Sequence, residues 1–233
     1  IYYNAFVNER EVFKEAFSNP DSSFEVEKAD KKMKVIVEHT SANPIHPLHI
    51  GHLRNAVLGD IIARMLKCRG HEVNTRFYVN DAGRQVAILV YGYLNLGKPS
   101  PPPDVKIDEW IGNIYSMTNV ILEIREIKEK LKTANDEERQ ELTRRLDELV
   151  SAAAKLAEKD KDSFYRLADA INADPNPEEK IAEIIRKYES KSDEEVVKTV
   201  RTLVNYALQG FNESLQKLGI SFDAFDFESD LLW

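Results

Sequence analysis

The chain has 233 residues and a mass of 26.7 kDa, a length that suits one domain or one and a half. Apolar residues make up 42 % of it, which is enough to build a core and excludes an intrinsically disordered chain. The 40 acidic and 32 basic side chains give a net charge of −8, which argues against a free-standing nucleic-acid binder with a basic surface. No apolar run approaches the roughly 18 residues of a membrane span, so we expect no membrane partner.

The cysteine content and the two ends of the chain indicate the redox compartment and whether the chain is part of a longer protein. The single cysteine, Cys68, excludes a disulfide framework and is typical of a reducing compartment. We expect it to be a small buried residue on a helix. The chain begins at Ile1 without an initiator Met and stops at Trp233 inside a patterned segment, so we expect a piece of a longer protein.

Residues 1 to 32 are expected to be the tail of a preceding domain and a linker. Aromatic residues between Tyr2 and Phe17 have a spacing typical of a strand or turn that leads into a short helix. The run Asn19-Pro20-Asp21-Ser22-Ser23 then ends that helix, because Pro and Ser continue helices poorly.

Residues 33 to 98 have the pattern of a βαβ unit. The β-branched run Met33–Glu38 predicts a buried parallel strand, and the three-four spacing of apolar residues from His52 to Arg69 predicts an amphipathic helix. A second strand is predicted over Glu72–Val79, followed by a turn and another helix. This order implies a parallel sheet with a right-handed crossover, and therefore an α/β fold.

Residues 99 to 218 are predicted to be a helical insertion. Four prolines between Lys98 and Val105 form a stiff connector, and the composition changes across it. Beyond Asp108 the sequence is highly charged, with apolar stripes typical of helices that pack against helices. In the last segment, residues 219 to 233, apolar and polar residues alternate, which predicts a strand that returns to the sheet.

Three of the five histidines, His46, His49 and His52, fall within seven residues between the first strand and the next helix. Open α/β sheets bind ligands at this place, and a helix start favours an anion there. Gly51 has no side chain, so a planar base or a phosphate can approach the backbone. Histidines in a loop are more often surface or core residues, and no nearby Cys, Asp or Glu completes a zinc site, so we expect no metal held by the protein.

The motif His49-Ile50-Gly51-His52 is identical to the first signature of class I aminoacyl-tRNA synthetases, and the residues around it are more specific. The stretch from Val37 to Pro44, Val-Glu-His-Thr-Ser-Ala-Asn-Pro, resembles the strand and loop of arginyl-tRNA synthetases. Tyr78-Val79-Asn80-Asp81-Ala82-Gly83-Arg84-Gln85 is similar to the later strand and turn of that family. The resemblance is close over residues 35 to 98 and looser, with the archaeal-type branch, toward the chain end.

This resemblance implies a Rossmann-like (HUP-type) nucleotide-binding domain, of which the chain carries the first half with a large helical insertion. Residues 1–32 would end an additional N-terminal domain. Residues 33–98 would form the first βαβ half with the signature, 99–218 the insertion, and 219–233 the strand returning to the sheet.

The implied reaction is that of a cytoplasmic arginine--tRNA ligase. ATP, with Mg²⁺ as its counter-ion, activates L-arginine to arginyl-adenylate and releases pyrophosphate, and the arginyl group then passes to tRNA(Arg). The second signature, a Lys-Met-Ser-Lys-Ser-like loop, is not found in the sequence, nor are the family's later arginine-pocket residues. We therefore expect the isolated chain to be inactive.

The resemblance also assigns roles to single residues. His49 and His52 would be catalytic, stabilising the charge that develops at the α-phosphate. The residues expected to bind ATP are Pro47, His49, Gly51 and His52. The residues expected to bind arginine are Glu38, Ser41, Ala42, Asn43 and His52. The residues expected to line the site are Asn80, Asp81 and Gln85.

Other interpretations of these residues stay open at this point. Glu38 could be a surface charge at a strand end, and Asp81 with Gln85 could be a helix cap and its neighbour. The signature alone also fits a small nucleotidylyltransferase of the His-x-Gly-His group or a non-catalytic module derived from a synthetase. A cysteinyl-type enzyme is disfavoured, because those hold zinc with cysteines and this chain has one Cys.

Overall fold

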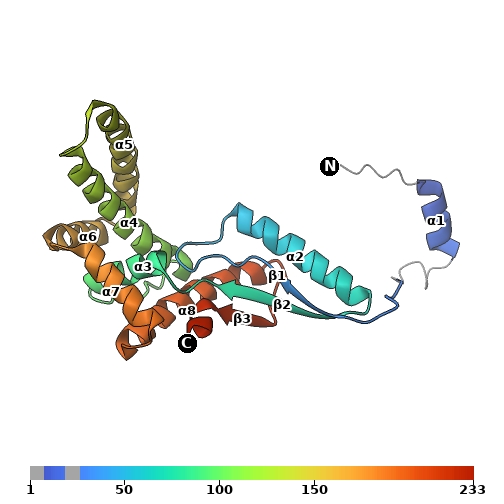
Figure 1. The fold of residues 1–233 in the computed structure, drawn as a ribbon. Coiled ribbons are helices and arrows are strands. Elements are labelled where there is room, and N and C mark those ends of the chain that lie inside the picture. Colours follow the sequence, from blue (N-terminus) through green and yellow to red (C-terminus); the bar gives the residue numbers. More distant parts are fainter. Residues whose placement is uncertain (1–7, 19–26) are drawn as a thin grey trace.

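The computed structural model describes residues 8–18 and 27–233 (Figure 1). Its elements in chain order are α1 (Glu9–Ser18), β1 (Lys34–Glu38), α2 (Ile50–Cys68), β2 (Glu72–Val79), α3 (Arg84–Asn95), α4 (Ile107–Leu131), α5 (Asp136–Lys159), α6 (Lys161–Ala173), α7 (Pro177–Glu189), α8 (Glu194–Gln216), β3 (Ala224–Phe227) and α9 (Glu228–Leu232). The short helix predicted near the N-terminus is present as α1. The strand or turn expected before it, and the Pro-Ser stop after it, lie outside the described residues.

Within the described residues, three parallel strands form one sheet in the order β1-β2-β3. Lys34 pairs with Glu72 at one end of β1, and Arg76 pairs with Ala224 where β3 joins. Helix α2 connects β1 to β2, whereas α3 to α8 all lie in the connection from β2 to β3. The predicted βαβ unit is therefore confirmed, and the two predicted strands are placed within one residue of their observed starts.

The sheet is covered on one face. Thr75, Phe77 and Val79 alternate along β2 and are buried, whereas the residues between them are only half buried. The ring of Phe77 lies 6.2 Å from that of Phe211 on α8 and 5.4 Å from that of Phe225 on β3. This alternation is the mark of a strand with one face in the core and the other outside it.

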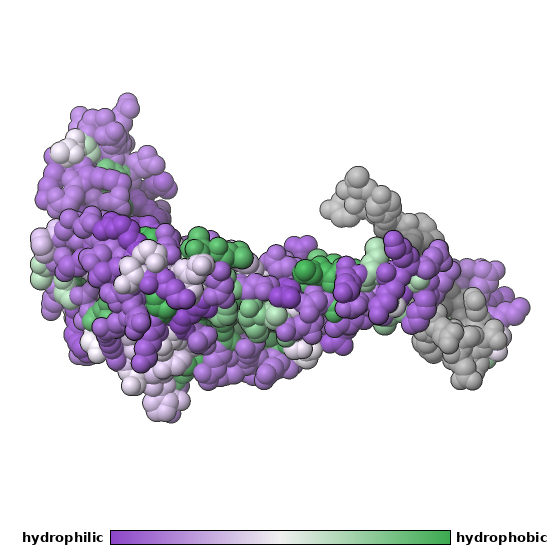
Figure 2. Space-filling view, turned by 60° about the horizontal axis from the view of Figure 1, so that its bottom comes forward, coloured by the Kyte–Doolittle hydropathy of each residue, from purple (hydrophilic) through white to green (hydrophobic). Residues whose placement is uncertain are grey.

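The helical part is built around α4, which packs against α3, α5, α6 and α8. Gly92 on α3 lets α4 approach closely, since a Cβ there would lie 2.0 Å from the Thr118 hydroxyl oxygen. Figure 1 shows α4 and α5 extending away from the sheet, and Figure 2 shows this helical end covered mostly by hydrophilic residues. The helices predicted beyond Asp108 are thus present as α4 to α8.

A buried ion pair connects the start of α4 to α8. The side chain of Asp108 is 1 % exposed, and the Lys106 ammonium contacts both of its oxygens at 2.5 Å. The same ammonium donates to the Gly210 carbonyl at 2.7 Å. A Cβ at Gly210 would lie 2.4 Å from the carboxylate carbon, so the carboxylate occupies the space that only glycine leaves there.

Three expectations need correction. The strand over Met33–Glu38 was predicted to be buried, but the residues of β1 alternate between exposed and half buried, and Ile36 is 69 % exposed, because nothing in the described part of the chain covers that face of the strand. The returning strand predicted over residues 219–233 is only Ala224–Phe227, and helix α9 follows it. The cause is tertiary, because the N–H of Ser229 donates to the Asp81 carboxylate rather than to a neighbouring strand. Cys68, expected to be buried, is exposed at the last residue of α2. None of the helices in the described part of the chain is long and apolar enough to cross a membrane.

Candidate active site

Two predicted site residues, Glu38 and Asn80, and one residue that was not predicted, Glu228, lie at the carboxyl edge of the sheet. Glu38 is the last residue of β1, Asn80 follows β2, and Glu228 follows β3. The loop from residue 39 to 49 runs from β1 to the start of α2. Parallel sheets bind ligands at this edge, because loops and helix starts from several strands meet there.

The turn after β1 is shaped by Ser41. Thr40 and Ser41 have φ of 71° and 41°, a left-handed region that non-glycine residues seldom adopt. The Ser41 hydroxyl donates to Glu38 Oε1 at 2.5 Å and accepts the backbone N–H of Tyr78 at 3.1 Å. These two bonds hold the strained turn, and they fix the Glu38 carboxylate beside the next strand.

The rest of the loop is anchored by burial. The side chains of Ala42 and Ile45 are 2 % and 1 % exposed, so they secure the loop in the core. Between them, Asn43 Nδ2 donates to Gln85 Oε1 at 2.8 Å. The structure thus brings together Asn43 and Gln85, two predicted site residues that are far apart in the sequence, while the methyl group of Ala42 points into the core.

Histidines cap the first turn of α2. The N–H of Gly51 donates to His49 Nδ1 at 3.1 Å, and the N–H of His49 donates to His52 Nδ1 at 3.3 Å, forming a reciprocal capping box. A ring nitrogen that accepts a hydrogen bond carries no proton, so in each of these two rings the proton sits on Nε2. The capping box therefore leaves two Nε2–H donors for a ligand.

The three rings of the cluster lie close together. Ring centroids are 3.8 Å apart for His49 and His52, and His46 lies 5.7 Å from His52. Burial lowers the pKa of His52 below its ordinary value, and the charges of His49 and His46 lower it further. His52 is therefore neutral at neutral pH, in the form that makes the capping bond.

Two glycines let this loop pack tightly. A Cβ at Gly51 would lie 2.9 Å from the His49 ring, so the missing side chain makes room for the capping histidine itself. On α4, a Cβ at Gly112 would lie 2.8 Å from the Pro47 ring and 3.2 Å from the His46 backbone. Helix α4 of the helical part therefore contacts the loop of residues 39–49, which leads to the histidine signature and is called the signature loop below.

The carboxyl edge gathers acidic groups around one phenol. The pKa of Tyr78 is raised, first by burial and then by the charges of Glu228, Asp81 and Glu38. Neither Tyr78 nor Glu228 was assigned a role from the sequence. Glu228 could have been recognised by its place directly after a strand in the same parallel sheet, but that strand was predicted to continue through it.

Asp81 is not open to a ligand. It is 0 % exposed, and its oxygens accept hydrogen bonds from Ser229 and Tyr188. It does not cap α3 either, because the N-cap of that helix is Gly83. Its neighbour Asn80 lies at the edge, and with its amide turned to suit its neighbours it donates to Glu228 Oε2 at 2.7 Å.

His39, the first residue after β1, has a buried side chain. Its ring contacts Phe222, with centroids 4.5 Å apart, and burial lowers its pKa. A Cβ at Gly59 on α2 would lie 2.2 Å from this ring. His39 is therefore a packing residue of the core.

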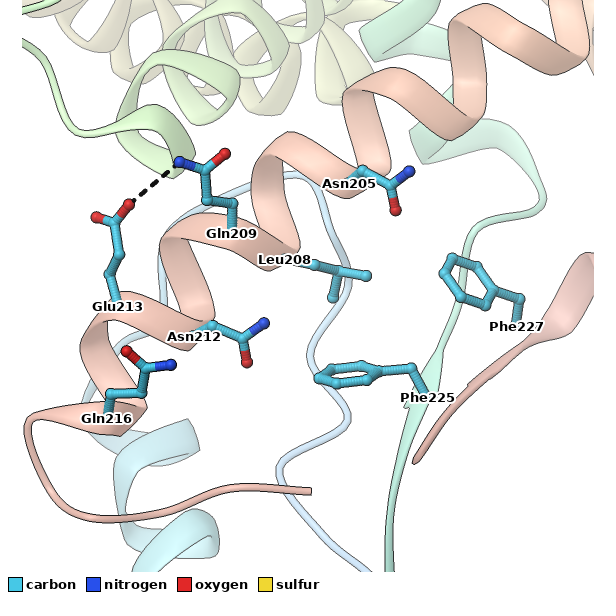
Figure 3. Close-up of a pocket in the computed structure, with 8 residues that line it drawn as sticks. All are labelled: Asn205, Leu208, Gln209, Asn212, Glu213, Gln216, Phe225 and Phe227. Atoms are coloured by element: carbon cyan, nitrogen blue, oxygen red, sulfur yellow. Dashed lines mark hydrogen bonds between the residues drawn. The ribbon is translucent and has the colours of Figure 1, made fainter. Parts of the chain in front are cut away.

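The described part of the chain has one hollow beside the histidine loop and another away from it. One of about 510 Å³ lies between the signature loop and the helical part, with His46 and Pro47 on one side and Asn113 and Lys159 on the other. Another of about 540 Å³ lies between α8 and β3, where amide side chains of α8 face Phe225 and Phe227 (Figure 3). The second hollow shares no residue with the histidine loop. In residues 8–18 and 27–233, no three His, Cys, Asp or Glu side chains converge as a metal site would require.

Known proteins similar to this chain point to one family. The family model described as "tRNA synthetases class I (R), catalytic domain" matches residues 19–127. The arginine--tRNA ligases of Sulfurisphaera tokodaii and Saccharolobus solfataricus are 59 % and 57 % identical to this chain, and each match covers 100 % of the chain. The chain spans 37 % of the length of each of these relatives.

The solved structure of Thermus thermophilus arginyl-tRNA synthetase matches with a TM-score of 0.53 and 24 % identity, over 97 % of this chain and 28 % of that one. At that identity the match shows a shared fold, in agreement with the parallel sheet and its helical insertion. The family model over residues 19–127 and the archaeal relatives, which are 57–59 % identical over the whole chain, show that the chain belongs to the class I arginyl-tRNA synthetase family.

Proposed function

We propose that this chain is part of the catalytic domain of a cytoplasmic arginine--tRNA ligase. The observation that carries the proposal is the carboxyl edge, where a carboxylate at the end of β1 and two histidine Nε2–H donors at the start of α2 lie on one connected loop. The first feature suits a guanidinium or ammonium group, and the second suits a phosphate.

The domain organisation that we propose has the boundaries expected from the sequence. Residues 1–32 end an additional N-terminal domain, and residues 33–98 carry the first half of the nucleotide-binding fold. Residues 99–218 form the insertion, and residues 219–233 return the chain to the sheet. The parallel sheet and the helices of the second crossover support this division.

For arginine we propose binding by Glu38, Ser41, Ala42, Asn43 and His52, with Asn80 and Gln85 lining the site. A guanidinium offers five donors in a rigid fork, and carboxylates satisfy it best. Glu38 is held for this purpose by the Ser41 hydroxyl at 2.5 Å. Ala42 contributes by its backbone, because its side chain is buried.

For ATP we propose Pro47, His49, Gly51 and His52, with Mg²⁺ as the counter-ion of the triphosphate. A carboxylate oxygen of arginine forms a bond to the α-phosphorus, and the bond from that phosphorus to the bridging oxygen breaks. Pyrophosphate leaves with the electron pair. A positioned donor aimed at the developing charge is typically worth about 2.7–4 kcal/mol, or roughly a hundred- to a thousandfold in rate.

In the second step, a hydroxyl of the terminal adenosine of tRNA(Arg) attacks the arginyl carbonyl carbon. The bond to the phosphate oxygen breaks, and AMP leaves. The hollow beside His46 and Lys159 opens between the signature loop and the insertion, and it provides space next to the site for the end of an RNA chain.

The test is pyrophosphate exchange by the complete protein that contains this chain, with each amino acid in turn and total tRNA present. We expect exchange with arginine alone, and its loss by roughly a hundredfold or more in His52→Ala. An intact, folded protein that exchanges with no amino acid, or with a different one, would discard the proposal. The isolated 233-residue chain, run alongside, is expected to show no exchange.

A further inference from the structure

A single buried carboxylate joins three parts of the fold behind the site. Asp81 is 0 % exposed and directly follows the edge residue Asn80. Its Oδ1 accepts the Ser229 N–H at 2.9 Å, and its Oδ2 accepts the Ser229 hydroxyl at 2.7 Å. The Tyr188 hydroxyl also donates to Oδ2, and Arg201 Nε lies 3.7 Å from it.

These partners come from different elements. Tyr188 lies in the last turn of α7, Arg201 on α8, and Ser229 in the first turn of α9. Arg201 also donates to the Ser229 hydroxyl at 2.7 Å, and its guanidinium lies 4.2 Å from the Phe227 ring centroid. Burial, followed by the bond to Asp81, raises the pKa of Tyr188, so the phenol stays protonated and remains a donor.

The residues held by this network adjoin the proposed arginine pocket. Asn80 directly precedes Asp81, and Glu228 directly precedes Ser229. Asn80 in turn donates to Glu228 at 2.7 Å. A shift of the Asp81 carboxylate would therefore move both edge residues together, whereas the histidines at the start of α2 lie on another loop.

We propose that Asp81 and Tyr188 are positioning residues that set the place of Asn80 and Glu228 at the arginine pocket and couple helices α7 and α8 to it. Neither residue touches substrate. The inference rests on the proposed function, and it adds that the helical insertion takes part in amino-acid binding through the end of α7.

The chain offers a matched control for Tyr188. Tyr91 on α3 is also 3 % exposed, and its hydroxyl donates at 2.7 Å to another buried carboxylate, that of Asp174. Asp174 lies after α6, and neither residue adjoins the carboxyl edge of the sheet. Tyr188→Phe and Tyr91→Phe thus remove the same atom from the same kind of bond, one beside the site and one away from it.

The experiment compares both variants in the complete protein, by thermal unfolding and by pyrophosphate exchange with varied arginine and varied ATP. We expect both to lower the unfolding temperature by similar amounts. Only Tyr188→Phe should raise the KM for arginine, by about fivefold or more, with the KM for ATP unchanged. Ser229→Ala, which removes the other side-chain donor to Asp81, should show the same split.

The outcomes separate the two proposals. If the wild-type protein exchanges with arginine and Tyr188→Phe has the arginine KM of Tyr91→Phe, the coupling is refuted and the proposed function stands. A rise in the KM for ATP equal to that for arginine would also refute it, because that is the behaviour of a general structural defect. If the wild-type protein does not exchange with arginine, both proposals fall.

Discussion

At the scale of single residues, the signature histidines have two tasks in one geometry. Ser or Thr with Glu usually form a capping box, but here His49 and His52 do so. The bonds to their Nδ1 atoms fix the tautomer, and the Nε2–H groups remain free to donate. The capping bond requires the neutral ring, because a protonated His52 can no longer accept a hydrogen bond at Nδ1, so protonation of His52 would break the capping box.

The titration of His52 tests this electrostatic account. The neighbouring charges of His49 and His46 lower its pKa, in addition to burial. His46→Gln removes one of these charges, so the pKa of His52 should rise toward 6.5, as measured by its ring proton shifts in NMR. An unchanged midpoint would show that His46 does not influence the pair.

The same shift predicts how stability depends on pH. The folded-state pKa of His52 lies below the unfolded value of 6.5, so folding favours the neutral ring. The stabilisation from the capping bond is therefore fully present above pH 6.5, and it is lost as the pH falls through the lowered pKa. Chemical denaturation at several pH values should show this loss in the wild-type chain and a smaller one in His52→Asn.

Glu38 permits a substitution that changes charge and keeps shape. Glu38→Gln retains an oxygen for the Ser41 hydroxyl but removes the negative charge offered to arginine. A hydrogen bond to a charged group is worth about 1.5–3 kcal/mol, so the KM for arginine should rise roughly ten- to a hundredfold. Glu72→Gln, at the exposed start of β2, is the matched control and should leave it unchanged; equal effects would remove Glu38 from the pocket.

At the scale of elements, glycines decide how closely helices approach the site. Gly59 lets α2 lie against the His39 ring, and Gly112 lets α4 lie against Pro47. Neither contact follows from the sequence, because the helical pattern of each segment shows which face is apolar but not what packs on it. Gly59 makes a contact in the core, whereas Gly112 contacts the signature loop directly.

Gly112→Ala is expected to move the signature loop. The added Cβ would lie 3.2 Å from the His46 backbone, so side-chain rotation alone cannot relieve the contact. We expect a destabilisation of about 1–3 kcal/mol, typical of overpacking, and a lower kcat in pyrophosphate exchange. Ser116→Ala, one turn further along α4, is the control; a Gly112→Ala protein with wild-type kcat would show that α4 does not position the loop.

At the scale of the whole molecule, the described part of the chain exposes an apolar surface. This surface lies on α2, where large hydrophobic side chains are exposed at helical spacing. Apart from it, Ile36 on β1 is 69 % exposed. The residues on α2 that form this surface are Val57, Leu58, Ile61, Ile62 and Met65. Parallel sheets normally have both faces covered, and this chain spans 37 % of the length of its relatives.

The exposed surface should make the isolated chain associate and bind hydrophobic dyes. Leu58→Lys with Ile62→Lys places two charges on that side of α2 and should reduce both effects without lowering the unfolding temperature. Light scattering and dye fluorescence measure them. A wild-type chain that stays monomeric and binds no dye would show that this surface causes neither association nor dye binding.

Short-range patterns in the sequence are sufficient to predict the local elements and the family. The β-branched run before Glu38 predicts a strand, and the three-four spacing after His52 predicts a helix; the structure confirms both elements but not the burial of the strand. The signature between them predicts the family to which the relatives belong. The end of β3 at Phe227 and the burial of Asp81 could not be predicted in this way, because both depend on the contact between Asp81 and Ser229, which lies 148 residues further along the chain. Local periodicity reports which face of an element is apolar, whereas the partner of a buried carboxylate is set by how distant elements pack.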